Sequence, residues 1–104
     1  MEPREILEQN REAIEDLCRR FHVVRLRIFG SAANGSWESD SDFDFLVEYG
    51  QGSRTLPPLD RLVGLEAELE ELLGRRVDAV DWNAASNPYF RESAEETAEL
   101  FYAA

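Results

Sequence analysis

The alternation of apolar and polar residues along the chain predicts helices and short strands in turn. Over residues 1–21, apolar side chains recur at three- and four-residue intervals with charges between them, which is the pattern of one amphipathic helix. The segment 23–29 then alternates, with Val24, Leu26 and Ile28 separated by two arginines, as expected of a strand with one buried face. The first helix is therefore expected to pack on a sheet.

The rest of the chain shows the same two periodicities, separated by turns rich in glycine and proline. The pattern predicts a short helix within a turn at 30–35, a strand over 42–49, a loop over 50–58, a helix over about 59–73 that ends at Gly74, a strand over 75–81, and a last helix from Asn87–Pro88 to about the C-terminus. On the first strand, Arg25 and Arg27 are expected to lie on a solvated face, with acidic groups or phosphate as the alternative partners.

Size and composition indicate one globular domain, residues 1–104. A hydrophobic content of 43% is ordinary for such a chain and excludes disorder throughout. Because no apolar run approaches the roughly 20 residues that span a bilayer, and no apolar signal core follows the N-terminus, we expect a cytoplasmic protein. The single cysteine, Cys18, is expected to be a buried, inert thiol, and His22, the only histidine, a surface or capping residue.

The balance of charge narrows the classes of partner. The chain has 11 basic and 22 acidic residues, for a formal net charge of -11. Nucleic-acid backbones repel such a chain, and no basic stripe offsets the repulsion, so long nucleic acid is disfavoured as a substrate. A small nucleotide held through a metal ion and a basic protein partner both remain open.

Asp42 and Asp44 stand two residues apart at the start of the second predicted strand, so their side chains point the same way. Two like charges about 4 Å apart repel by roughly 1 kcal/mol in water and about 4 kcal/mol at an effective protein dielectric of 20. Such a pair needs a counter-charge, and a divalent metal ion is the obvious candidate. A calcium loop starting at Asp40 does not fit, because its sixth position is Phe45 rather than glycine and its twelfth is Gln51.

The turn between the first two strands can supply an anion site. Gly30 permits a positive φ or a close backbone approach, Ser31 is a good N-cap, and Gly35 can end the short helix. Free N–H groups at such a turn bind anions, although Gly-Ser pairs are also common in ordinary turns. Trp37, on the polar loop that follows, either serves a base or a partner or covers the edge of the core.

A third carboxylate, Asp78, lies in the middle of a short apolar strand, where it is unfavourable unless it is paired or bound to a metal. Asp81, at the exit of that strand, is expected to be exposed. If the strands that carry Asp44 and Asp78 are neighbours, three carboxylates converge beside a backbone phosphate cradle. Such a site can hold two divalent ions that clamp a triphosphate and activate an attacking oxygen.

These motifs together resemble a known family. Gly30-Ser31 is followed after ten residues by Asp42-Phe43-Asp44, and a later strand carries Asp78. This arrangement is similar to the minimal nucleotidyltransferases, the smallest form of the superfamily that includes DNA polymerase β. The resemblance covers nearly the whole chain, including the closing Asn87-Pro88-Tyr89-Phe90 helix. It implies an α+β nucleotidyltransferase fold, with a small mixed sheet flanked by helices in the order helix, strand, short helix, strand, helix, strand, helix.

The resemblance also implies roles: the turn holds the phosphates of ATP, Asp42 and Asp44 bind two Mg²⁺ ions, and Asp78 binds one of these ions and helps to activate the acceptor hydroxyl. The phosphate-binding residues are then Gly30, Ser31, Asn34 and Gly35, and the metal-binding and catalytic residues are Asp42, Asp44 and Asp78. One departure matters, because Asn34 stands where members usually carry a basic residue. An amide donates a hydrogen bond but offsets no charge, and charge-assisted bonds are roughly twice as strong as neutral ones.

Relatives that modify antibiotics or extend nucleic acid carry further acceptor domains that these residues do not include. Minimal members look like the antitoxin half of bacterial two-gene modules, in which AMP from ATP is transferred to a tyrosine of a HEPN-domain ribonuclease toxin. The resemblance thus implies an ATP- and magnesium-dependent protein adenylyltransferase, in a hetero-oligomer with a HEPN toxin. Two alternatives stay open: a weakened module that neutralises the toxin by binding alone, and a transferase for a small molecule such as an aminoglycoside.

Overall fold

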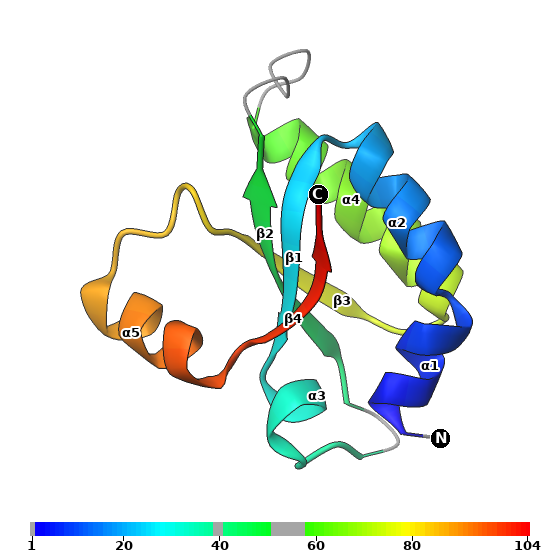
Figure 1. Ribbon diagram of the computed structural model, residues 1–104, viewed down its shortest axis with the longest axis horizontal. Helices are drawn as coiled ribbons and strands as arrows, with labels where there is room; N and C mark the ends of the chain where they lie inside the picture. The colour runs from blue at the N-terminus through cyan, green and yellow to red at the C-terminus, as the bar shows by residue number, and fades with distance from the viewer. Residues whose placement is uncertain (1, 39–40, 51–57) are drawn as a thin grey trace.

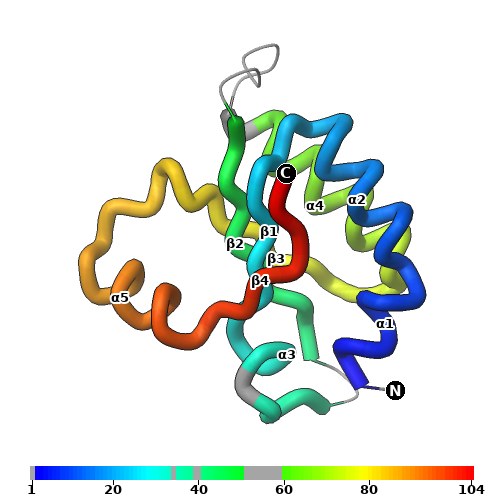
Figure 2. The backbone as a smooth tube through the Cα atoms, viewed as in Figure 1, coloured from blue at the N-terminus to red at the C-terminus, as the bar shows by residue number. Residues whose placement is uncertain are grey.

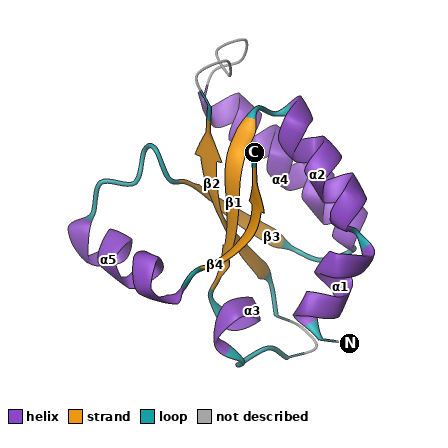
Figure 3. Cartoon of the chain, in the orientation of Figure 1, coloured by secondary structure: helices purple, strands orange, loops and turns teal. Residues whose placement is uncertain are grey.

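The computed structural model describes residues 2–38, 41–50 and 58–104, within which a four-stranded sheet carries helices on both faces (Figure 1, Figure 3). The helices are α1 (Pro3–Gln9), α2 (Arg11–Arg20), α3 (Ser31–Asn34), α4 (Pro58–Leu73) and α5 (Pro88–Thr97), and the strands are β1 (Val23–Phe29), β2 (Phe43–Tyr49), β3 (Val77–Asp81) and β4 (Glu99–Ala103). This is the expected α+β architecture. The expected loop over 50–58 lies mostly outside the described residues, as does Asp40. In the described part, no helix is long and apolar enough to cross a membrane.

The sheet is mixed, with the strand order β3-β2-β1-β4. β1 runs antiparallel to both β2 and β4, whereas β2 runs parallel to β3. A parallel pair needs a crossover connection, and α4 provides it between β2 and β3. The two strands that carry aspartates are therefore neighbours, which meets the condition set for the three carboxylates to converge.

The two faces of the sheet are covered differently. Helices α2 and α4 lie side by side on one face, and α5 lies alone on the other, while the trace ends in β4 beside β1 (Figure 2). The main core, on the first face, consists of Leu7, Ile14, Leu17, Cys18, Val23, Leu26, Ile28, Ala32, Phe43, Phe45, Val47, Tyr49, Leu65, Leu69, Leu73, Val77, Ala79 and Phe101. The second core, under α5, consists of Leu46, Trp82 and Ala94 with partly buried neighbours that include Phe29 and Phe90.

The N-terminal segment forms two helices rather than the one predicted over 1–21. Asn10 separates them with φ -111° and ψ 12°, outside the helical region. Its side-chain amide donates to the carbonyl of Ile6 at 2.8 Å, and its own carbonyl accepts from the amide of Ile14 at 2.9 Å. Asparagine offers such local side-chain bonds in competition with helical geometry. The apolar spacing continues across the break, so periodicity alone does not detect it.

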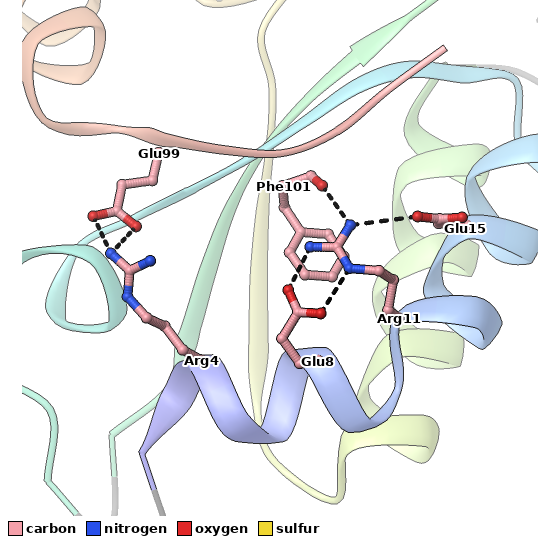
Figure 4. A network of polar contacts seen from close by, with 6 residues as sticks. All are labelled: Arg4, Glu8, Arg11, Glu15, Glu99 and Phe101. Atoms are coloured by element: carbon pink, nitrogen blue, oxygen red, sulfur yellow. Dashed lines mark hydrogen bonds and ion pairs between the residues drawn. The ribbon is translucent and has the colours of Figure 1, made fainter.

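The end of the chain is also different from the prediction, because the last helix stops at Thr97 and a fourth strand follows. Ala98 is extended, with φ -72° and ψ 143°, and β4 then pairs with the edge of β1. Arg11 on α2 donates to the backbone carbonyl of Phe101 at 2.9 Å, and Arg4 on α1 binds both carboxylate oxygens of Glu99 (Figure 4). The strand thus satisfies backbone groups of β1 that a continued helix would leave unpaired.

Two charged residues are more covered than the sequence predicted. Arg27, expected on a solvated face, is only 7% exposed; its guanidinium lies 4.4 Å from the centre of the Trp82 ring and 3.6 Å from the Glu95 carboxylate. Asp81, expected to be exposed, has a side chain only 12% exposed and lies 4.0 Å from Arg61. In both cases the covering residues are distant in the sequence: Trp82 and Glu95 for Arg27, and Arg61 for Asp81.

The predictions for the cysteine and the histidine are confirmed. Cys18 is buried in the main core, and burial followed by the charge of Glu15 raises the pKa of its thiol to about 12. His22 is exposed in the turn after α2, where it has a φ of 59°. Neither residue lies among the proposed site residues.

Candidate active site

The Gly-Ser turn begins directly where β1 ends. Gly30 has a φ of 72°, and Gly35, with a φ of 84°, ends α3 in the left-handed conformation. These values confirm the backbone conformations predicted for both glycines, since other residues adopt them only with strain. The N-cap is Gly30 rather than Ser31, which is instead the first residue of the helix. The side chain of Asn34 lies outside what the structure describes.

Gly30 lies against Asp44, so the two motifs of the sequence meet in space. Phe29, just before the turn, pairs with Asp44 across β1 and β2. A Cβ atom on Gly30 would collide with the Asp44 carboxylate, with Oδ2 as the nearest atom. Glycine is thus required here twice, by the backbone conformation and by the space that the carboxylate occupies.

Asp44 and Asp78 are direct neighbours across the parallel strands β2 and β3. Paired residues of adjacent strands place their side chains on the same face, here the face that α5 covers farther along. Burial, followed by the negative charges of Asp78 and Asp42, raises the pKa of Asp44 above its ordinary value of 3.8. Asp42 itself is exposed and precedes the first residue of β2. The protein thus concentrates negative charge at the end of the sheet beside Gly30.

The donor chemistry of this group fits a divalent cation. Carboxylate oxygens are the ligands that Mg²⁺ prefers, and burial together with the charges of Asp78 and Asp42 raises the pKa of Asp44. Within the described residues, no three acidic, histidine or cysteine side chains are already grouped closely enough to hold a metal ion. The structure therefore brings the backbone positions of Asp42, Asp44 and Asp78 together without closing their side chains around one point.

Helix α5 packs next to the strand position opposite Asp44. The ring of Phe90 meets the ring of Phe29 edge-on, with centroids 6.0 Å apart and an interplanar angle of 82°. Because Phe29 is the strand partner of Asp44, this contact holds α5 beside the site. The cap of α5 is the predicted one: the Asn87 side chain accepts from the amides of Tyr89 and Phe90.

Trp37 and Arg75 lie near the site but are not among its predicted residues. Trp37 is half-buried, with its ring centroid 4.7 Å from that of Phe43, so it covers the edge of the core, one of the two alternatives. The guanidinium of Arg75 lies 4.6 Å from the centre of the Trp37 ring. The sequence pattern placed Arg75 at the start of the predicted strand over 75–81, whereas β3 begins at Val77, so Arg75 lies in the segment between α4 and that strand.

This fold and this site define a nucleotidyltransferase. Residues 10–101 match the family model described as "Nucleotidyltransferase domain", and the chain belongs to that family. A solved structure described as a "putative minimal nucleotidyltransferase" is 40% identical, with a TM-score of 0.76 and coverage of 94% of both chains. The chain is thus similar to the minimal members of the family and shares their enzyme class.

Two further similarities concern protein-modifying relatives. A Methanocaldococcus jannaschii protein named "Putative protein adenylyltransferase" is 32% identical over 101 residues, which cover 97% of this chain and 94% of that protein. A solved structure described as a tri-AMPylated Shewanella oneidensis HEPN toxin in complex with MNT antitoxin is 22% identical, with a TM-score of 0.66 and coverage of 93% of this chain and 72% of that chain. The second similarity shows the fold.

Proposed function

We propose that the chain is an ATP- and magnesium-dependent protein adenylyltransferase that acts as the antitoxin of a HEPN-family ribonuclease toxin. The observation that carries the proposal is the close contact of Gly30 with the Asp44 carboxylate, together with the strand pairing of Asp44 and Asp78. A phosphate-binding turn and a group of carboxylates at one place suit transfer of a nucleotidyl group, which needs alignment and charge neutralisation. The names of the relatives support protein as the acceptor and a HEPN toxin as the partner.

In the proposed reaction, the hydroxyl oxygen of a tyrosine on the toxin bonds to the α-phosphorus of ATP. The bond from that phosphorus to the bridging oxygen breaks, and pyrophosphate leaves. Asp78 accepts the phenolic proton, while the turn from Gly30 to Gly35, with Ser31 and Asn34, holds the phosphates. Asp42 and Asp44, together with Asp78, would hold Mg²⁺, which supplies charge neutralisation to the triphosphate.

The charge of the chain supports a protein acceptor. At a formal net charge of -11, the chain attracts a basic partner and repels nucleic acid. A HEPN ribonuclease must bind RNA and therefore offers basic surface, so the two proteins suit each other electrostatically. The resulting association would bring the acceptor tyrosine to the site.

The test is an incubation of the chain with its HEPN-type partner, ATP and Mg²⁺, followed by intact-mass measurement of the partner. We expect a mass gain of whole AMP units on the partner and loss of its ribonuclease activity. Asp44→Asn should abolish the gain, whereas Asp60→Asn, at an exposed aspartate on α4, is the matched control and should not. Neutralisation of the toxin with no mass gain would overturn the proposal.

A second candidate function is neutralisation by binding alone, and Asn34 is the observation that favours it. A neutral amide at this position leaves the triphosphate with less positive charge than a basic residue would supply. On this alternative, Asp42→Asn and Asp44→Asn leave neutralisation intact. Asn34→Arg separates the two functions, because it should accelerate AMP transfer by an adenylyltransferase and leave a pure binding module unchanged.

A further inference from the structure

Arg75 joins the loop before β2 to the segment before β3. Its position follows from Gly74, whose φ of 67° ends α4 and redirects the chain toward β3. Its Nη1 atom donates to the backbone carbonyl of Ser41 at 2.9 Å, while its guanidinium lies over the ring of Trp37. One side chain thus makes two contacts with the loop that leads from the Gly-Ser turn to the aspartates.

These contacts bracket Asp42. Ser41, whose carbonyl accepts from Arg75, is the residue before Asp42, and Phe43, the residue after it, donates its amide to the carbonyl of Arg76 at 3.0 Å. The peptide groups on both sides of Asp42 are therefore bound to the two residues 75–76. Because Asp42 is exposed and lies outside β2, these bonds fix its place relative to the sheet more than its own side chain does.

The same segment fixes the second aspartate strand. β3 begins at Val77, directly after Arg76, and places Asp78 opposite Asp44. The loop on the other side is itself closed by a turn: Ser41 donates its amide to the carbonyl of Glu38 at 3.1 Å, and its hydroxyl accepts from the amide of Glu38 at 2.8 Å. Arg75 therefore links Ser41 to the segment that leads into β3.

We propose that Arg75 is a positioning residue of the active site, which holds Asp42 in register with Asp44 and Asp78. The proposal rests on the function proposed above for these aspartates. Arginine suits the task because its planar guanidinium stacks on an indole face and donates in its own plane at the same time, which a lysine cannot do. A displacement of about 1 Å in a group that binds or aligns a substrate can cost on the order of 100-fold in rate.

The test compares Arg75→Lys and Arg75→Met with Arg76→Met, a matched control at an exposed neighbour that contributes its backbone carbonyl. The first readout is the Mg²⁺ concentration that gives half of the thermal stabilisation by ATP, and the second is the rate of AMP transfer. We expect both Arg75 variants to need about tenfold more Mg²⁺ and to transfer AMP roughly tenfold to 100-fold more slowly. Arg76→Met should match the wild type in both.

Trp37→Phe is a second variant in case the Arg75 variants fold poorly; it removes the indole face and should raise the Mg²⁺ requirement less than Arg75→Lys does. If the variants lower the melting temperature but leave the Mg²⁺ requirement and the transfer rate unchanged, Arg75 is structural only and the proposal is wrong. Failure of the proposed function has a different signature, because the wild type itself would then transfer no AMP to the partner.

Discussion

The two faces of the sheet differ in how many residues they bury and in the charge they carry. Among the described residues, 18 are buried together in the main core, on the face that α1, α2 and α4 cover, whereas the second core under α5 has three. The face with few buried residues is the one that carries Asp44 and Asp78. In this small domain, most of the apolar packing lies on one face of the sheet, and the other face carries charged groups that include Asp44 and Asp78.

Even away from the carboxylates, the second face depends on charge. The indole of Trp82 lies between two arginines, with the guanidinium of Arg27 at 4.4 Å from the ring centre and that of Arg91 at 4.1 Å. Arg91 also donates to the carbonyls of Trp82 and Ala85. Cation–π contacts and hydrogen bonds thus do there what aliphatic side chains do on the first face. We therefore expect substitutions on the two faces to differ in kind.

The largest effect is expected from Asp44→Asn on the second face. Removal of one preorganised electrostatic group commonly lowers turnover by about 100-fold to 1,000-fold, and we expect AMP transfer to fall by at least that much. Stability should not fall, because the raised pKa of Asp44 means that its charge opposes the fold. Initial rates of transfer and urea unfolding of the same preparation measure the two effects. A variant that loses stability together with activity would contradict the division between the faces.

Leu69→Ala on the first face should do the reverse. Leu69 is 0% exposed within the main core, and truncation of such a leucine costs about 2–5 kcal/mol in the free energy of unfolding. Transfer by the molecules that remain folded should be unchanged. Leu100→Ala is the matched control, since Leu100 is 61% exposed and its truncation should cost under about 0.5 kcal/mol. Urea unfolding curves of both variants measure the difference.

The difference between the faces also explains how much the sequence could predict. The first face was predictable, because the alternation of Phe43, Phe45 and Val47 on a strand is a local pattern that a buried face requires. The position of Gly30 was predictable for a similar reason, since a strand that ends in Gly-Ser needs a backbone turn. The pairing of Asp44 with Asp78 followed once the motifs were read together.

Features that depend on distant contacts were not predictable. The burial of Arg27 comes from Trp82 and Glu95, which lie more than 50 residues farther along the chain. Strand β4 exists because β1 has an edge to be paired, which the local pattern after Thr97 does not reveal. The role of Arg75 likewise depends on its contact with Ser41, a residue on another loop. Sequence periodicity predicts which residues a segment can bury, but it does not identify the residues that cover them.

A smaller effect is expected from Arg27→Met. Arg27 is buried, and within the described residues its Nε and Nη2 atoms have no hydrogen-bond partner. Replacement of a buried charged group by an apolar one of similar size is often neutral or stabilising, so we expect the free energy of unfolding to stay within about 1 kcal/mol or to rise. Urea unfolding tests this, and Glu95→Gln is its companion, with an expected cost under about 1 kcal/mol because Glu95 is largely exposed.

The opposite result would change the comparison between the faces. A loss of several kcal/mol in Arg27→Met would mean that the stacked guanidinium stabilises the second face as strongly as leucines stabilise the first. The helix α5 would then depend on that charge for its place, and the second face would contribute to folding as well as to function.

The smallest effect is the pH dependence of the free energy of unfolding, and its sign follows from the raised pKa of Asp44. Because burial and the charges of Asp78 and Asp42 disfavour the carboxylate in the fold, the folded protein holds this proton to higher pH than the unfolded chain does. The stability from protonated Asp44 is fully present below its ordinary pKa of 3.8 and is lost as the pH rises through the raised value. The asparagine side chain in Asp44→Asn cannot ionise, so the free energy of unfolding of this variant minus that of the wild type should increase across this pH window and then stay constant.

Urea unfolding in EDTA at closely spaced pH values measures this difference in free energy, with Asp60→Asn as a control that shows no such rise. A cation at the site would remove the repulsion, so addition of Mg²⁺ should reduce the difference, and a difference independent of both pH and Mg²⁺ would show that Asp44 does not carry this charge.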